Sequence, residues 1–173
     1  MLNLIKNLSL QDWSQIFTIV GVVAAITVYI MNSLAQRRQR SIDNALRYMD
    51  CHSKLFTPDG YCMSNVKAME KGTYKRDLQN KEMEIKFNEF LSTCEHLALL
   101  HMAGGTSKSI NAYMIGWYAK HICPILTDRE KAEPYWELAI DFLKETKRQA
   151  EKLDGMSKED RLKYLSKNHF KYL

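Results

Sequence analysis

The sequence contains few of the residues that interrupt helices. Its 173 residues include 7 Gly and 3 Pro, which excludes collagen-like and low-complexity proteins and disfavours an all-β chain with frequent tight turns. The four cysteines show no Cys-x-x-Cys spacing. In a cytoplasmic domain we expect them to be reduced, with about half serving as small core residues. Apolar residues make up 46% of the chain and charged residues 26%, which excludes a wholly disordered protein.

Charged residues are absent from residues 13–36. At about 1.5 Å per residue, this helix would reach roughly 36 Å, more than the roughly 30 Å hydrocarbon core of a bilayer. Trp13 and Tyr29 lie near its two ends, where interfacial aromatic residues are expected. Ser9 and Asp12 have capping-box spacing. The sequence therefore predicts an N-terminal segment at 1–12 and a transmembrane helix at 13–36.

Two other interpretations of this stretch are a buried core helix and a cleaved signal peptide. Ser33-Leu34-Ala35 resembles a cleavage site, but the basic cluster follows the apolar run, whereas a signal peptide has it in front. The cluster consists of Arg37, Arg38 and Arg40. For a bacterial inner membrane, the positive-inside rule places the C-terminal 137 residues in the cytoplasm. The cluster also attracts anionic lipids, although a topology signal alone explains it.

The remainder of the chain has the patterns of an all-α domain. No Gly or Pro occurs between Val22 and Thr57, so we expect the first helix to continue through 37–56. We expect four or five helices to form a bundle at 57–173. Predicted helix boundaries in that bundle are a start at Thr73, an end at Gly104-Gly105, and starts at Ser107, Thr127 and Ser157. Pro134 fits a first turn, and Tyr135, Leu138 and Phe142 continue a helical face toward Leu153.

One stripe of the first helix repeats in alternating steps of four and three residues. Within the span it collects small or weakly polar residues: Ser14, Thr18, Gly21, Ala25, Val28 and Asn32. From Ala35, near the end of the span, the same stripe becomes mostly apolar: Ala35, Gln39, Ile42, Leu46, Met49, Ser53 and Phe56. We call these thirteen residues the seam. Small residues allow helices to approach closely in lipid. The seam is consistent with a simple anchor, specific self-association or a pore, and the uncharged span does not indicate a narrow ion-selective filter.

Arg47 and His52 form an Arg-x4-His pair, the spacing of the HEPN ribonuclease signature. Cleavage of RNA through the 2′-hydroxyl needs an acid or base near neutral pH and a cation for the phosphorane charge. Side chains at i and i+5 lie about 140° apart on a helix, so this pair needs a helix end or a partner subunit to converge. The structural interpretation is a solvated Arg and a partly exposed His. The residue after Arg is usually polar in HEPN enzymes, whereas this chain has Tyr48.

Other candidate sites have simpler structural explanations. His96 and His101 are five residues apart, which does not suit two metal ligands on one helical face. Glu95 has the apolar surroundings of a buried carboxylate paired with an Arg. The Gly104-Gly105-Thr106-Ser107 segment fits either a phosphate loop or two adjacent helix caps. The basic run 158–171 fits an RNA or lipid contact or a solvated helix face. We expect no cofactor and no metal.

The whole pattern resembles the small membrane-anchored HEPN-like accessory proteins of type VI-B CRISPR loci. The segments that carry this resemblance are MLNLIKNLSLQDWSQIFTIVGVVAAITVYIMNSLAQRRQR, RYMDCH and FNEFLSTCEHLALLHMAGG. The resemblance implies a homo-oligomer in the lipid bilayer whose pore depolarises or permeabilises the inner membrane. It also implies antiviral defence in functional association with an RNA-guided RNase effector. Direct RNA binding stays open.

Three hypotheses therefore follow from the sequence. The first is a non-enzymatic pore-forming effector built on the seam. The second is a membrane-tethered ribonuclease that uses Arg47 and His52. The third is a tethered adaptor that positions a partner protein.

Overall fold

The structure is a computed structural model that describes residues 9–166 of the chain. It separates into two compact units whose boundary lies between Gln39 and Arg40. The regular elements within the described range are all helices, in agreement with the predicted all-α class. Helix α2, Leu10–Leu55, contributes residues to both units.

The start of α2 is fixed by a reciprocal cap. The Asp12 amide donates to Ser9 Oγ at 3.2 Å, and the Ser9 amide donates to an Asp12 carboxylate oxygen at 2.8 Å. Hydrogen bonds from the Ser9 hydroxyl and amide lower the pKa of Asp12. The predicted capping box is therefore confirmed. The helix ends at Leu55, one residue before the predicted end.

The next two helices are α3, Tyr61–Glu70, and α4, Lys81–Met102. The predicted cap at Thr73 is wrong. The Asn80 side chain instead accepts a hydrogen bond from the Met83 amide and caps α4. Residues between α3 and α4 include a turn in which the Gln79 amide donates to Asp77 Oδ1 at 2.9 Å.

Arg76 holds this connecting segment in place. Its guanidinium pairs with Glu84 of α4 at 2.5 Å and with Glu130 at 2.7 Å, and only 5% of its side chain is exposed. It also lies 3.6 Å from the centre of the Phe87 ring. This tertiary ion cluster explains why residues 73–80 leave the helical path that local sequence suggested.

Ser107, Thr127 and Ser157 cap helices as predicted, because each side chain accepts from a backbone amide three residues later. The helical face expected from Thr127 toward Leu153 is interrupted at Glu133. Glu133 is extended, with ψ 120°, because the following Pro134 disfavours helical backbone there. The remaining elements are α5, Lys108–Ile122; η1, Cys123–Ile125; α6, Asp128–Ala132; η2, Pro134–Trp136; α7, Glu137–Asp154; and α8, Lys158–Leu165.

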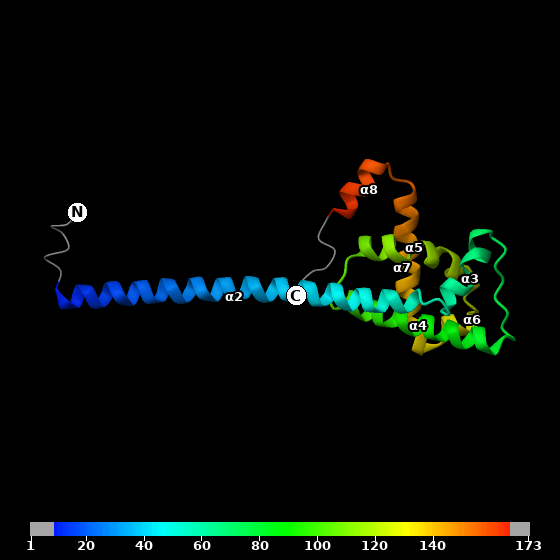
Figure 1. The fold of residues 1–173 in the computed structure, drawn as a ribbon, viewed down its shortest axis with the longest axis horizontal. Coiled ribbons are helices and arrows are strands. Elements are labelled where there is room, and N and C mark those ends of the chain that lie inside the picture. The colour runs from blue at the N-terminus through cyan, green and yellow to red at the C-terminus, as the bar shows by residue number, and fades with distance from the viewer. Residues whose placement is uncertain (1–8, 167–173) are drawn as a thin grey trace. The chain divides into compact units, whose positions relative to one another are not determined.

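The core of the second unit lies where α7 crosses α4 and α5 (Figure 1). A side chain at Gly116 would overlap the Ala150 methyl group, so glycine allows α5 and α7 to approach closely. Gly104 has φ +73° and continues the chain after α4, as the predicted helix end required. The largest fully buried side chains of this core are Tyr48, Phe87, Met69, Leu91, Leu97, Ile115, Ile122, Ile140 and Leu143.

Candidate functional site

The first unit contains the one helix of the described chain that is long and apolar enough to cross a membrane. Its most apolar 18-residue window has a mean hydropathy of 2.0, and none of that window is buried within the chain. A core helix of a soluble domain would be mostly buried, so the core-helix interpretation does not fit. Length and composition alone do not separate a span from a signal sequence. The basic residues Arg37, Arg38 and Arg40 are exposed.

The seam within this unit has an open, small-residue centre. A Cβ placed on Gly21 would meet no atom within 4 Å. The Thr18 hydroxyl donates to the Ser14 carbonyl at 2.8 Å, so this polar side chain is satisfied within its own helix. The predicted seam residues Ala25, Val28 and Asn32 are also exposed. This face can therefore accept another helix without rearrangement of the chain's own side chains.

The part of α2 that belongs to the second unit carries the apolar end of the seam. Ile42, Leu46 and Met49 are exposed on the surface of that unit, with 64% of Leu46 accessible. Phe56 does not continue this exposed row, because its ring packs 4.7 Å from Tyr118. The exposed apolar part of the seam therefore ends before Phe56.

Arg47 and His52 lie in different surroundings in the second unit. Arg47 is exposed and borders a groove whose other wall is formed by α4 residues, including His96 and Leu99. The His52 ring is half-buried and packs 4.5 Å from the Phe56 ring. One chain therefore does not bring this pair together, in keeping with the expected 140° separation.

His52 is held in a packed environment. Burial lowers its pKa, and a hydrogen bond to the Met114 carbonyl acts in the opposite direction. A lowered pKa leaves the imidazole neutral at pH 7, as a general base requires. However, the bond to the carbonyl occupies one ring nitrogen. A ribonuclease site would therefore need the other nitrogen and an arginine from a second subunit.

The simpler structural explanations hold for two further sequence candidates. His101 Nδ1 lies 3.2 Å from both the carbonyl and the hydroxyl of Thr106, so this side chain has polar partners within the bundle. The Ser107 cap shows that the Gly104–Ser107 segment joins two helix ends. Glu95 is half-buried, but the buried arginine of this unit, Arg76, pairs with two other glutamates. Residues 167–171 of the basic run lie outside the described residues.

The cysteines and potential metal ligands offer no reactive centre in the part of the chain described. Cys62 and Cys94 are buried core residues, which confirms the expectation for half of the four. Burial raises the pKa of Cys62 to about 12 and that of Cys123 to about 11, so both thiols stay protonated at neutral pH. Across residues 9–166, no three His, Cys, Asp or Glu side chains are grouped as a metal site.

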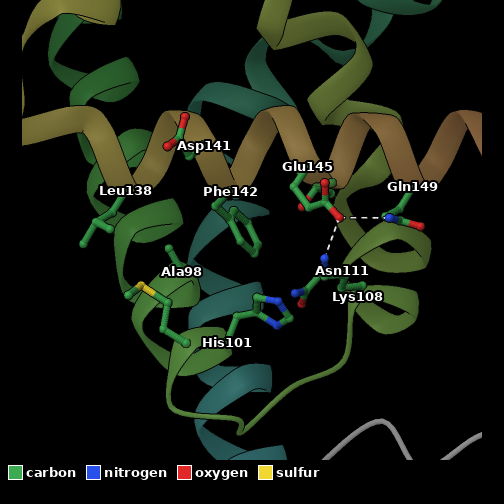
Figure 2. Close-up of a pocket in the computed structure, with 11 residues that line it drawn as sticks. Ala98, His101, Lys108, Asn111, Leu138, Asp141, Phe142, Glu145 and Gln149 are labelled. Atoms are coloured by element: carbon green, nitrogen blue, oxygen red, sulfur yellow. Dashed lines mark hydrogen bonds and ion pairs between the residues drawn. The ribbon is translucent and has the colours of Figure 1, made fainter.

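Sequence reasoning missed a pocket between α4, α5 and α7 (Figure 2). Its polar lining includes Lys108 and Asn111 of α5 and Glu145 of α7, two helices that become neighbours only when the bundle folds. The one available signal was Asn111 itself, because an amide in the apolar run of α5 is unusual.

Comparison with protein-family models, curated proteins and solved structures finds no match to this chain. The HEPN-like resemblance accordingly remains a prediction from the sequence.

Proposed function

We propose that this protein is a homo-oligomeric membrane effector whose spanning helices associate through the seam and surround an aqueous path. The observation that carries the proposal is an apolar helix window with none of its residues buried in its own chain. Burial of that surface requires lipid, other copies of the chain, or both. A bilayer covers the apolar faces, and the small-residue seam suits a neighbouring helix.

The second unit offers independent support for self-association. Ile42, Leu46 and Met49 are exposed in a unit that lies in water under this proposal. They follow the same heptad-like steps as the seam residues of the span. Contact between copies through these residues would bury apolar area outside the membrane, where the hydrophobic effect acts at full strength.

The path itself depends on how many copies associate. Ser14, Thr18 and Asn32 are polar residues on the seam, and a sufficiently wide ring of helices would place them around water. Because the Thr18 hydroxyl already donates a hydrogen bond to the Ser14 carbonyl, Thr18 can also lie in a helix contact without water. A narrow assembly would therefore be a closed oligomer, and a wide one a pore.

The resemblance extends the proposal to its setting. Under it, the second unit lies in the bacterial cytoplasm, the span lies in the inner membrane, and the pore strengthens antiviral defence by an RNA-guided RNase. The additional phage protection that this chain provides should then depend on the nuclease. Protection that is equal without the nuclease would contradict the CRISPR association but not the pore.

Substitution of Gly21 provides the sharpest test. A Cβ on Gly21 would meet no atom within 4 Å, so we expect a defect of Gly21→Leu to come from contact between copies. We expect about a tenfold lower oligomer population in detergent and loss of induced membrane depolarisation. The matched control Val22→Leu adds bulk at the next position, off the seam, and should retain both properties. Equal behaviour of the two variants would contradict the seam as the interface.

The His52→Gln variant distinguishes the ribonuclease hypothesis from the pore proposal. The pore proposal expects depolarisation and phage protection to continue in this variant. Simultaneous loss of RNA cleavage and protection, with normal oligomerisation and thermal stability, would instead establish the ribonuclease. An adaptor would be indicated if Gly21→Leu preserved protection while preventing oligomerisation.

A further inference from the structure

The pocket between α4, α5 and α7 has the size of a small-molecule site. Its volume is about 340 Å³, near the lower end of the range of roughly 300–1,000 Å³ for ligand pockets. Figure 2 shows Phe142 of α7 facing the same space as His101 of α4. Ala98, Met102 and Leu138 extend the apolar lining. The space therefore suits a compact ring system with a largely apolar face.

Asn111 leaves an unmet hydrogen-bonding requirement at this pocket. Its side chain lines the pocket, and the residue is only 2% exposed. Its Nδ2 donates to Thr106 Oγ1 at 3.4 Å, whereas its Oδ1 accepts no hydrogen bond from any residue in the range 9–166. A buried acceptor without a donor is costly. A donor supplied by a bound molecule would remove that cost.

His101 lies beside this amide. Its Nδ1 is 3.2 Å from both the carbonyl and the hydroxyl of Thr106, so it either donates to the carbonyl or accepts from the hydroxyl. His101 and Asn111 are joined through the Thr106 hydroxyl. The unpaired acceptor of Asn111 therefore calls for a ligand that carries an N–H donor.

The charged groups around the pocket are already paired. Glu145 accepts from Lys108 Nζ at 2.9 Å and from Arg148 at 2.5 Å. Burial acts to raise the pKa of Glu145, but hydrogen bonds from Lys108, Gln149 and Arg148 lower it to about 2. Asp141 pairs with Lys144 at 3.6 Å. Neither a phosphate nor an ammonium group finds an unpaired partner charge among these residues, which favours an uncharged ligand.

We propose that this pocket binds an uncharged, planar, amino-substituted heterocycle of the adenine class, as a free base or nucleoside. The amino group donates to Asn111 Oδ1, and the ring packs against Phe142. An asparagine amide suits this edge, because adenine presents an amino donor beside a ring-nitrogen acceptor. This site does not depend on the membrane function proposed above.

The test measures adenosine binding to the full-length protein in detergent by isothermal titration calorimetry. Purine riboside is the matched ligand, since it lacks only the amino group of adenosine. We expect one adenosine per chain, with at least about tenfold weaker binding of purine riboside because Asn111 Oδ1 then stays unpaired. No adenosine binding up to about 1 mM, or equal binding of the two ligands, would overturn the proposal.

Asn111→Leu tests the residue directly. It should weaken adenosine binding at least about tenfold, whereas the same substitution at exposed Asn88 of α4 should leave binding unchanged. The unliganded Asn111→Leu protein should melt no lower than the parent, because it loses a buried unpaired acceptor. A melting temperature several degrees lower would show that Asn111 serves the fold, and unchanged adenosine affinity would likewise refute the site.

Binding of a nucleotide tests the proposal that the ligand is uncharged. Adenosine 5′-monophosphate should bind no tighter than adenosine, since Lys108 is already paired with Glu145. Tighter binding of the monophosphate that Lys108→Met abolishes would show a phosphate site and contradict the uncharged ligand.

Discussion

The two units of this chain differ in how much of their apolar side-chain surface is buried. In the second unit Phe87 is fully buried between aromatic neighbours and Arg76. In the first unit the apolar window has no buried residues, and 57% of Val23 is exposed. The second unit meets its hydrophobic requirement internally, whereas the first depends on its surroundings. Substitutions in the second unit should therefore lower the stability of the fold, whereas substitutions in the first unit should impair membrane insertion.

The largest expected effect lies in the core of the second unit. Phe87→Ala should lower the free energy of unfolding by about 3–5 kcal/mol, because it removes a fully buried ring and leaves a cavity. Denaturant unfolding followed by circular dichroism measures this change. Ile85→Ala, at an exposed position of the same helix, should cost less than about 1 kcal/mol. Similar losses in both variants would contradict the assigned core.

A charge in the span should affect insertion and spare the bundle. Val23→Arg should disfavour membrane insertion by about 2.5–3.5 kcal/mol. The assay is the fraction of protein that resists carbonate extraction from membranes. Leu162→Arg, at an exposed position of α8, should insert normally. Full insertion of the Val23 variant would show that this window does not lie in lipid.

The Arg76 cluster is a polar exception inside the second unit. Arg76→Met should lower the free energy of unfolding by about 2–3 kcal/mol, since it leaves Glu84 and Glu130 facing each other without their cation. Arg161→Met, at an exposed position, is the control.

Adding Glu84→Gln and Glu130→Gln to Arg76→Met should recover part of this loss. No recovery in this triple variant, measured by denaturant unfolding, would show that charge repulsion is not the cause.

The smallest effect concerns acid stability. The folded-state pKa of Glu145 is about 2, below its usual value of 4.5. Its contribution is therefore present above the unfolded pKa and is lost as pH falls from about 5 towards 2. We expect about 1–2 kcal/mol from this partly exposed group. Glu145→Gln should flatten the acid limb of stability against pH, and an unchanged limb would contradict the assignment.

Local sequence predicted most helix boundaries because the capping atoms lie within three residues of each other. Ser9, Ser107, Thr127 and Ser157 are examples. The start of α4 was missed because Arg76 pairs with Glu130, 54 residues away, and this contact holds the segment before α4 outside the helix. The break at Glu133 was in principle readable from Pro134, whose ring disfavours helix at the residue before it.

The candidate sites also divide into features of a single helix, which the sequence predicts, and features that depend on the packing of several helices. The span and seam are periodic features of one helix, so the sequence alone could propose them. The separation of Arg47 from His52 was predicted from helix geometry, but the groove beside Arg47 and the packing of His52 required the folded bundle. The pocket at Asn111 combines three helices, and no spacing in the sequence indicates it.

The sequence by itself determined the helical class, the apolar first helix and most caps, because these depend on composition and on contacts between near neighbours. Only the tertiary structure decided which polar groups of distant segments are paired. It buried Arg76 with two glutamates and left one acceptor of Asn111 without a donor from residues 9–166. The physical reason is that hydrogen bonds between distant segments depend on how the helices pack, which a local pattern does not encode.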